Sequence, residues 1–208
     1  AGTGTNTATS YFGISGTTGN INVNDAVSWS SHKLTLSASN NIYINAVMTG
    51  SSNASLALNY GQGSVASGNT SVMQTKLGPS DAYIGKITLP ASTSNFTTKQ
   101  GSDGTVKNYT VLTSLPASLV ASTNYAVGAD IIYTGTGRVP YLATGNYTGT
   151  FDGLGNTISN LIVTPQSGNN AFIGIITTGT VQNLGLKNIS ISGANTSTGA
   201  GAIAGTLS

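Results

Sequence analysis

Residues 34–44 read LTLSASNNIYI, in which two short alternations of apolar and polar residues flank a run of small polar residues. Each alternation places two apolar side chains on one face of a strand, and the run between them is typical of a turn. The pattern predicts an all-β protein built from very short strands. The alternating triplets are Ile21–Val23, Leu34–Leu36, Ile42–Ile44, Leu56–Leu58, Ile87–Leu89, Leu184–Leu186 and Ile189–Ile191.

Strands of three residues are too short for a stable isolated hairpin or sandwich. They suit a parallel β-helix, in which each coil pairs with the coils above and below and the inward side chains form one apolar column. Internal recurrence supports this architecture, because residues 158–163 recur at 181–186, 23 positions later. Phe172-Ile173-Gly174 is similar to Ile203-Ala204-Gly205, 31 positions later, so we expect coils of unequal length.

Charge is scarce, since only 6% of the 208 residues are charged and the chain has 7 Lys or Arg, five Asp and no Glu. This suits stacked coils, where like charges would repel one another, whereas Ser, Thr and Asn stack with hydrogen bonds. The basic residues are scattered, which argues against nucleic acid as a partner. The chain has no Cys and one His, so disulfides and Cys- or His-based metal sites are excluded, and we expect no cofactor.

The pattern divides the chain into four parts. Residues 1–20 are predicted to be a linker or a first irregular coil, and residues 21–63 to be β-helix coils. Residues 64–125 contain longer strand-like segments, which leaves open an extra-helical β excursion or a run of longer coils. Residues 126–208 are predicted to be coils with Gly-rich repeats that continue beyond the fragment, and any export signal is expected upstream of Ala1.

Residues 146–161, NYTGTFDGLGNTISNL, resemble the Gly-Thr-Phe-Asp-Gly-Leu-Gly segment of filamentous haemagglutinin-like adhesins. Residues 34–45 and 128–131 are similar to further elements of these proteins and occur in the same order. The later Gly-rich repeats are also similar, with Ile173-Gly174-Ile175 in place of a Leu pair. The resemblance covers roughly residues 20–208.

The resemblance implies a right-handed parallel β-helix that is exported by two-partner secretion through an outer-membrane transporter of a Gram-negative bacterium. It implies a secreted or cell-surface protein that attaches to a glycan or protein on host cells, on other bacteria or in matrix. The family's secretion domain carries Asn-Pro-Asn motifs, and this sequence contains no Asn-Pro. We therefore expect an interior segment of a longer adhesin, whose open coil edges allow end-to-end self-association.

Two other functions remain open. A polysaccharide-acting β-helix enzyme needs paired carboxylates, and Asp130 and Asp152, 22 positions apart, are close enough to coil spacing to stack on neighbouring coils. His32 with Asp25 lacks a nucleophile-elbow motif, so an exposed loop is the simpler role for this His. A purely structural stalk is the third alternative, and the prediction is a non-enzymatic adhesin segment.

Aromatic residues are the more plausible ligand-binding groups, because their faces stack on the apolar faces of sugars. The candidates are Trp29, Tyr43, Tyr133 and Tyr141, for each of which packing in the core or at a coil corner is the alternative. In the Gly-Thr-Phe-Asp-Gly stretch, Gly153 and Gly155 are expected to allow positive φ, and Asp152 to close the turn onto backbone N–H groups. A Ca²⁺ or sugar site at Asp152 lacks neighbouring acids.

Overall fold

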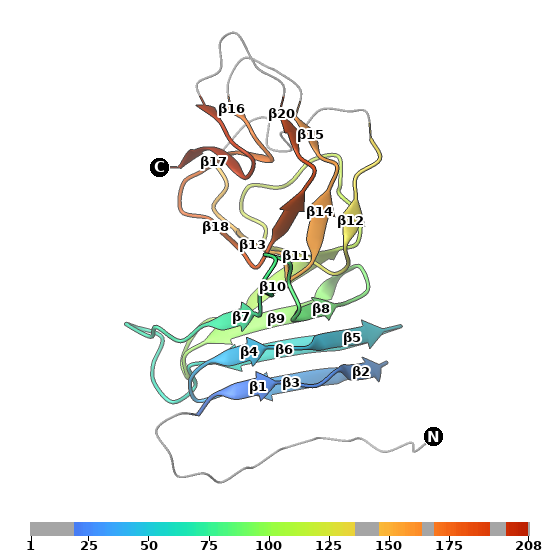
Figure 1. Cartoon of the computed structure of the whole chain (residues 1–208). Coiled ribbons are helices and arrows are strands. Elements are labelled where there is room, and N and C mark those ends of the chain that lie inside the picture. Colours follow the sequence, from blue (N-terminus) through green and yellow to red (C-terminus); the bar gives the residue numbers. More distant parts are fainter. Residues whose placement is uncertain (1–18, 136–145, 164–168, 192–198, 208) are drawn as a thin grey trace.

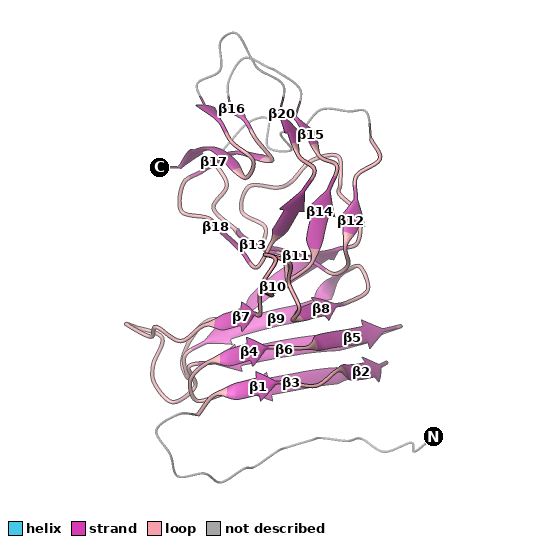
Figure 2. Ribbon diagram, in the orientation of Figure 1, coloured by secondary structure: helices cyan, strands magenta, loops and turns pink. Residues whose placement is uncertain are grey.

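The computed structural model describes residues 19–135, 146–163, 169–191 and 199–207, and these residues form strands and loops only (Figure 1, Figure 2). Within this part of the chain, no helix has the length and hydrophobicity needed to cross a membrane. Seven sheets result, and all but one of their strand pairs are parallel. The fold is thus all-β, with many parallel strands in stacked sheets, as the short alternating triplets predict.

The first nine strands form an N-terminal stack, residues 21–100, in which each pass of the chain adds one strand to each of three sheets. The sheet orders are β1-β4-β7, β2-β5-β8 and β3-β6-β9, and every pair within them is parallel. The strands are β1 (Ile21–Val23), β2 (Val27–Ser30), β3 (Lys33–Ser37), β4 (Ile42–Ile44), β5 (Val47–Ser51), β6 (Ser55–Tyr60), β7 (Met73–Thr75), β8 (Lys86–Thr88) and β9 (Ser92–Gln100).

The alternating triplets supply the core of this stack. Ile42 and Ile44 on β4, and Leu56 and Leu58 on β6, are fully buried, whereas Tyr43 between the two Ile residues is only partly buried. Burial of an aliphatic side chain of this size stabilises the fold by about 1.5–3 kcal/mol. The alternation therefore determines both which residues form strands and which face of each strand points inward.

Asparagines align at the turns between successive passes. The Oδ1 atom of Asn20 accepts hydrogen bonds from the backbone N–H and from Nδ2 of Asn41, at 2.9 and 3.2 Å. Nδ2 of Asn45 donates to Oδ1 of Asn24 at 2.8 Å, one turn further along the chain. These bonds satisfy polar groups at the corners and agree with the expectation that Asn residues stack between passes.

An antiparallel pair joins the N-terminal stack to the rest of the chain. β9 runs parallel to β6, whereas β10 (Lys107–Leu112) runs antiparallel to β9 and parallel to β11. The connecting loop contains Gly101 at φ +83°, where an added Cβ would lie 2.5 Å from the backbone of Ala66. Glycine alone suits this position, because it adopts positive φ without steric cost and brings no side chain against Ala66.

The remaining strands form a C-terminal stack, residues 107–207. β10, β11, β13 and β18 extend the sheet of β3, β6 and β9 to seven strands, and four smaller sheets pair later passes in parallel. The remaining strands are β11 (Tyr125–Val127), β12 (Ile131–Ile132), β13 (Thr150–Asp152), β14 (Thr157–Ser159), β15 (Ile162–Val163), β16 (Asn169–Asn170), β17 (Ile173–Ile176), β18 (Thr180–Gln182), β19 (Gly185–Lys187), β20 (Ser190–Ile191), β21 (Gly199–Ala200) and β22 (Ala204–Leu207).

Aromatic side chains fill the core of the C-terminal stack. Phe151 and Phe172 are fully buried, and their rings meet edge to face with centroids 5.3 Å apart. Tyr147, also fully buried, donates from its hydroxyl to the Thr123 carbonyl at 3.0 Å, which satisfies its polar end inside the core. Burial accordingly raises the pKa of Tyr147 well above the ordinary value.

One of the two predicted recurrences gives the correct register, and the other is wrong. Ile173 pairs with Ala204, 31 positions later, which confirms that recurrence. The 23-residue recurrence fails, because Ile158 pairs with Leu186 rather than with Val181. The turns explain the difference, since Asn160 and Asn188 are both left-handed, at φ +62° and +53°, and Asn188 donates to Asn160 at 3.3 Å. Aligning these two corners sets the longer spacing.

Residues 64–125 contribute strands to both stacks. β7, β8 and β9 lie on the three N-terminal sheets, and long loops between them make this pass longer, so that Ile42 pairs with Met73 and Leu56 with Phe96. β10 and the start of β11 lie beyond the reversal. The predicted linker at residues 1–20 falls mostly outside the described residues.

Candidate functional site

The two stacks meet at the segment Thr150–Thr157, which belongs partly to each. Phe151 and Ile158, on either side of this turn, lie in the C-terminal core, whereas Leu154 is fully buried in the N-terminal core. The backbone N–H of Ile87 on β8 donates to the Leu154 carbonyl at 2.9 Å. The turn thus covers the edge strand of an N-terminal sheet, and edges left open are prone to pair with other chains.

Two residues of this turn adopt positive φ. Leu154 lies at +52° and Gly155 at +79°, and Gly155 approaches the Gly85 carbonyl so closely that an added Cβ would lie 2.3 Å from its oxygen. Gly153 does not have positive φ, and its contribution is close approach, since an added Cβ would lie 2.3 Å from the Asn183 carbonyl oxygen. Both glycines therefore permit contacts that a larger residue would block.

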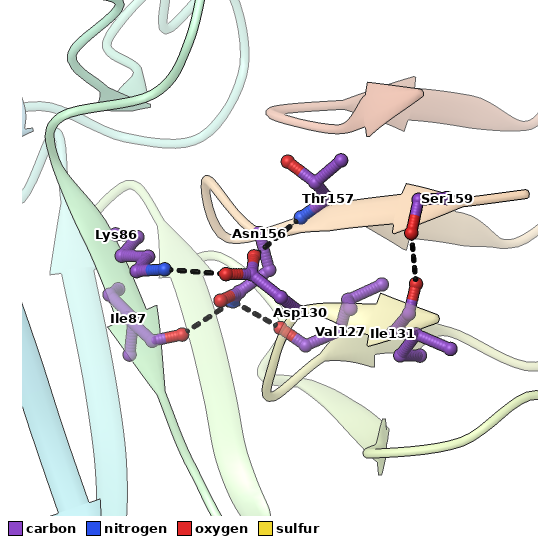
Figure 3. A network of polar contacts seen from close by, with 8 residues as sticks. All are labelled: Lys86, Ile87, Val127, Asp130, Ile131, Asn156, Thr157 and Ser159. Carbon is purple, nitrogen blue, oxygen red and sulfur yellow. Dashed lines mark hydrogen bonds and ion pairs between the residues drawn. The ribbon is translucent and has the colours of Figure 1, made fainter. Parts of the chain in front are cut away.

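A second set of bonds at the junction surrounds Asn156 and Asp130 (Figure 3). Asn156 is fully buried, and its Nδ2 donates to the carbonyls of Ile87 and Val127, both at 2.8 Å. Asp130 accepts from Lys86 Nζ at 2.7 Å and from the Thr157 backbone N–H at 2.9 Å. Burial by itself would raise the pKa of Asp130. The two hydrogen bonds and the positive charge of Lys86 together have the larger effect, so the pKa of Asp130 lies below its ordinary value.

A cleft, here called the junction cleft, opens between the stacks on another side of the same turn. It consists of two hollows of about 310 and 530 Å³ that share Gln74 and Asn183 in their walls. The N-terminal stack supplies strands β4, β6, β7 and β9 to these walls, and the C-terminal stack supplies β10, β13 and β18. Strands on both sides of the chain reversal between β9 and β10 thus line the cleft.

Amides, hydroxyls and tyrosine rings line the cleft. The first hollow is bounded by Tyr60, Ser71, Val72, Met73, Gln74, Gln100, Lys107, Tyr109, Thr150, Thr180, Gln182 and Asn183. The second is bounded by Tyr43, Asn45, Gln74, Thr75, Lys76, Leu77, Tyr83 and Asn183. Such a surface offers many hydrogen-bond donors and acceptors together with aromatic faces.

A buried carboxylate lies beneath this wall. Asp152 is completely buried, and it accepts hydrogen bonds from Gln182 Nε2 at 2.6 Å, from Asn183 Nδ2 at 3.1 Å and from the Leu154 backbone N–H at 2.9 Å. Burial raises the pKa of Asp152, and the three hydrogen bonds oppose this shift without cancelling it. Its visible role is to fix the two amides of the cleft wall.

The Asp152 charge also reaches the tyrosines of the cleft. Burial raises the pKa of Tyr60 and Tyr83, and the negative field of Asp152 raises both further. The same two causes raise the pKa of Tyr109, whose hydroxyl lies 3.2 Å from Thr98 Oγ1, and that hydrogen bond partly opposes them. These tyrosines are therefore neutral at physiological pH and can both donate and accept hydrogen bonds.

The four aromatic residues predicted as ligand-binding groups do not gather at one site. Tyr43 lines the second hollow. Trp29 is partly buried against the N-terminal core, and its Nε1 donates to the Ser55 carbonyl at 3.1 Å. Tyr133 packs against the C-terminal core, and Tyr141 lies outside the described residues. Sequence reasoning missed Tyr60, Tyr83 and the side-chain amides that line the cleft. The one available signal was the polar pair Gln182-Asn183 within the recurring segment 181–186.

The described acids do not form a catalytic pair of the kind considered. The register places Asp152 opposite Ala126, not opposite Asp130, so the hypothesis that these two Asp residues stack is wrong. Asp130 is bound to Lys86, and Asp103 accepts from the Ala66 backbone N–H at 2.7 Å. Among the described residues, no three of His, Cys, Asp or Glu lie close enough together to hold a metal ion.

Comparison with known proteins gives no match: no family model, no curated protein and no solved structure aligns significantly with the chain.

Proposed function

We propose that the chain is a segment of a secreted, filamentous haemagglutinin-like surface adhesin of a Gram-negative bacterium, folded as a right-handed parallel β-helix. In this proposal its activity is attachment to host cells, to other bacteria or to matrix, and it catalyses no reaction. The observation that carries the proposal is the parallel pairing of successive passes in stacked sheets, with Asn residues hydrogen-bonded at the corners.

This architecture suits a rod that folds outside the cell. Within each stack the strands of one pass pair with those of the next, so strands can add one pass at a time as the chain leaves an outer-membrane transporter. Backbone pairing and aliphatic burial supply the stability, and the chain contains no cysteine that would need oxidation. The resemblance of residues 146–161 to the adhesin segment adds the family and the compartment to the proposal.

Attachment also needs a surface that can recognise something, and the junction cleft supplies one. Its walls offer amides and tyrosines without a described carboxylate among them. A polysaccharide-acting enzyme would need two acids flanking a bound sugar, typically about 5–9 Å apart. Asp152, the carboxylate that binds Gln182 and Asn183 of the wall, is buried beneath it and accepts three hydrogen bonds.

The test is to incubate the purified chain with host cells, bacterial cells, host glycans and exopolysaccharides, and to record both retention and the release of new reducing ends. We expect saturable retention with no release. Release of reducing ends would replace the proposal with an enzyme, and the absence of both would favour a stalk with no ligand. Measurements across a range of protein concentrations separate retention from self-association.

A further inference from the structure

We propose that the two hollows of the junction cleft form one groove that binds a neutral oligosaccharide. This inference rests on the proposed function, since it names the ligand class and the site of an attachment segment. Because the hollows share Gln74 and Asn183, a ligand that fills both must pass over these two residues. A chain of sugar residues meets this requirement, whereas a single sugar would occupy one hollow only.

The groove retains hydrogen-bonding groups that the described protein does not use. The side-chain amide of Gln74 and the hydroxyls of Tyr60 and Tyr83 have no hydrogen-bond partner among the described residues, although all three lie in the cleft walls. Each Tyr hydroxyl donates and accepts, and the amide carries two N–H donors and a carbonyl acceptor. Sugar hydroxyls have the same dual character, so they match such a surface better than a purely accepting or purely donating ligand does.

Other amides of the groove are held in fixed orientations before any ligand arrives. Gln100 Nε2 donates to the carbonyls of Asn69 and Ser71 at 2.9 and 2.8 Å, which leaves its carbonyl oxygen as an acceptor. Gln182 Nε2 donates to the buried Asp152 at 2.6 Å and retains one N–H and its carbonyl oxygen. Fixing these groups in advance reduces the entropy lost on binding.

Charge favours a neutral ligand over an acidic one. Lys107 lines the first hollow and Lys76 the second, so the described cations do not converge on one point. Recognition of a carboxylate or sulfate usually involves a bidentate Arg or several cations together. The rings of Tyr60 in the first hollow and Tyr83 in the second suit the apolar C–H faces of uncharged sugar rings.

The experiment measures the affinity of the full chain for an array of neutral, amino and acidic oligosaccharides, followed by variants of the groove. We expect neutral oligosaccharides to be retained, Gln74→Ala and Tyr83→Ala each to weaken binding about tenfold or more, and the double variant to lose it. Asn53→Ala, which removes an exposed amide outside both hollows, and Lys33→Ala are the matched controls and should bind as the parent does. Circular dichroism and thermal melts establish that each variant is folded.

Four results would overturn the inference. If only acidic glycans are retained and Lys107→Ala or Lys76→Ala abolishes binding, the ligand is an anion. If neutral glycans bind equally well to Gln74→Ala and Tyr83→Ala, the site lies elsewhere while the attachment function stands. If cells are retained and glycans are not, the groove does not bind oligosaccharide. If the parent chain retains neither, the proposed function fails as well.

Discussion

The two stacks use the same parallel pairing, and their cores differ in composition. In the first two passes of the N-terminal stack, Ile21 pairs with Ile42 and Lys33 with Ser55, and the core is mainly aliphatic. In the C-terminal stack, Phe151 pairs with Val181, 30 positions later, and aromatic rings fill the core. An aromatic ring fills more volume than an aliphatic side chain, so the two cores reach native packing density with different sets of side chains.

The junction shows how two such stacks become one body. Leu154 leaves the C-terminal stack and fills a position in the N-terminal core, with Phe151 and Ile158 anchored on the other side. Core composition can therefore change along the chain, because residues of the C-terminal stack, Leu154 among them, also lie in the N-terminal core. Substitutions in the segment Thr150–Thr157 test whether the two stacks depend on each other for stability.

The largest effect is expected from Leu154→Ala. Leu154 is 0% exposed, and truncating a buried Leu costs about 2–5 kcal/mol because the cavity does not close completely. Since the lost contacts join the two stacks, chemical denaturation of the variant should separate into two transitions. The control is Leu77→Ala, where the side chain is 51% exposed and the change should stay within about 0.5 kcal/mol. Equal destabilisation by both variants would contradict the role of Leu154.

Gly155→Ala should destabilise next most strongly. The backbone lies at φ +79°, and the added Cβ would meet the Gly85 carbonyl across the junction, so we expect a loss of about 1–3 kcal/mol from strain at a special conformation. Gly68 is a matched control, because it lies at φ +71° with nothing within 4 Å of the added Cβ. The excess cost at Gly155 over Gly68 in urea denaturation measures the contact between stacks, and no excess would mean that the stacks do not touch there.

The buried Asp152 should make stability depend on pH. Its folded pKa is raised above the ordinary value of 3.8, so the folded state binds the proton more tightly than the unfolded state does. The stabilisation is complete below the unfolded pKa and is lost as the pH rises through the folded pKa, with a slope of up to about 1.4 kcal/mol per pH unit in that window. Asp152→Asn should remove this slope in melts recorded from pH 3 upwards, and an unchanged slope would assign it to another group.

The smallest effect is expected at the ion pair of Lys86 and Asp130, where the Asp130 side chain is 53% exposed. Asp130→Asn should cost about 0.5–1 kcal/mol at low ionic strength, and less in high salt because partly exposed pairs are screened. The lowered pKa of Asp130 predicts that this stability is present above its unfolded pKa and lost as the pH falls through the folded pKa. A salt-independent cost would indicate that the Thr157 hydrogen bond, rather than the charge, matters.

The strands of this chain were predictable, and the junction was not. Every alternating triplet coincides with or overlaps a strand, because period-two alternation is a local pattern that directly reflects one buried face. The register of Ile173 with Ala204 also followed from sequence. The register of Ile158 did not, because it depends on matching left-handed corners at Asn160 and Asn188, which similarity between apolar strands does not reveal.

The cleft escaped prediction for a related reason. Tyr60 and Gln182 line the same hollow although 122 positions separate them, and the reversal that brings them together consists of one antiparallel pair. The local sequence of β10 has no feature that distinguishes it from a strand that pairs in parallel with the preceding one. Asp152 was expected to close its turn, and its hydrogen bond to the Leu154 N–H has that geometry, but its support of Gln182 and Asn183 depends on a partner strand from the next pass.

The central claim is that the two stacks form one body with a fixed cleft between them, and native-state hydrogen exchange tests it most directly. The backbone N–H groups of Ile87 and Leu89 donate across the junction to Leu154 and Gly128, both at 2.9 Å, whereas Ala38 donates within the N-terminal stack at 2.8 Å. We predict that the amides of Ile87 and Leu89 exchange as slowly as that of Ala38, and that they exchange faster in Leu154→Ala. Rapid exchange of Ile87 and Leu89 in the unaltered chain, with Ala38 still protected, would show that the stacks are not joined and that the cleft is no fixed site.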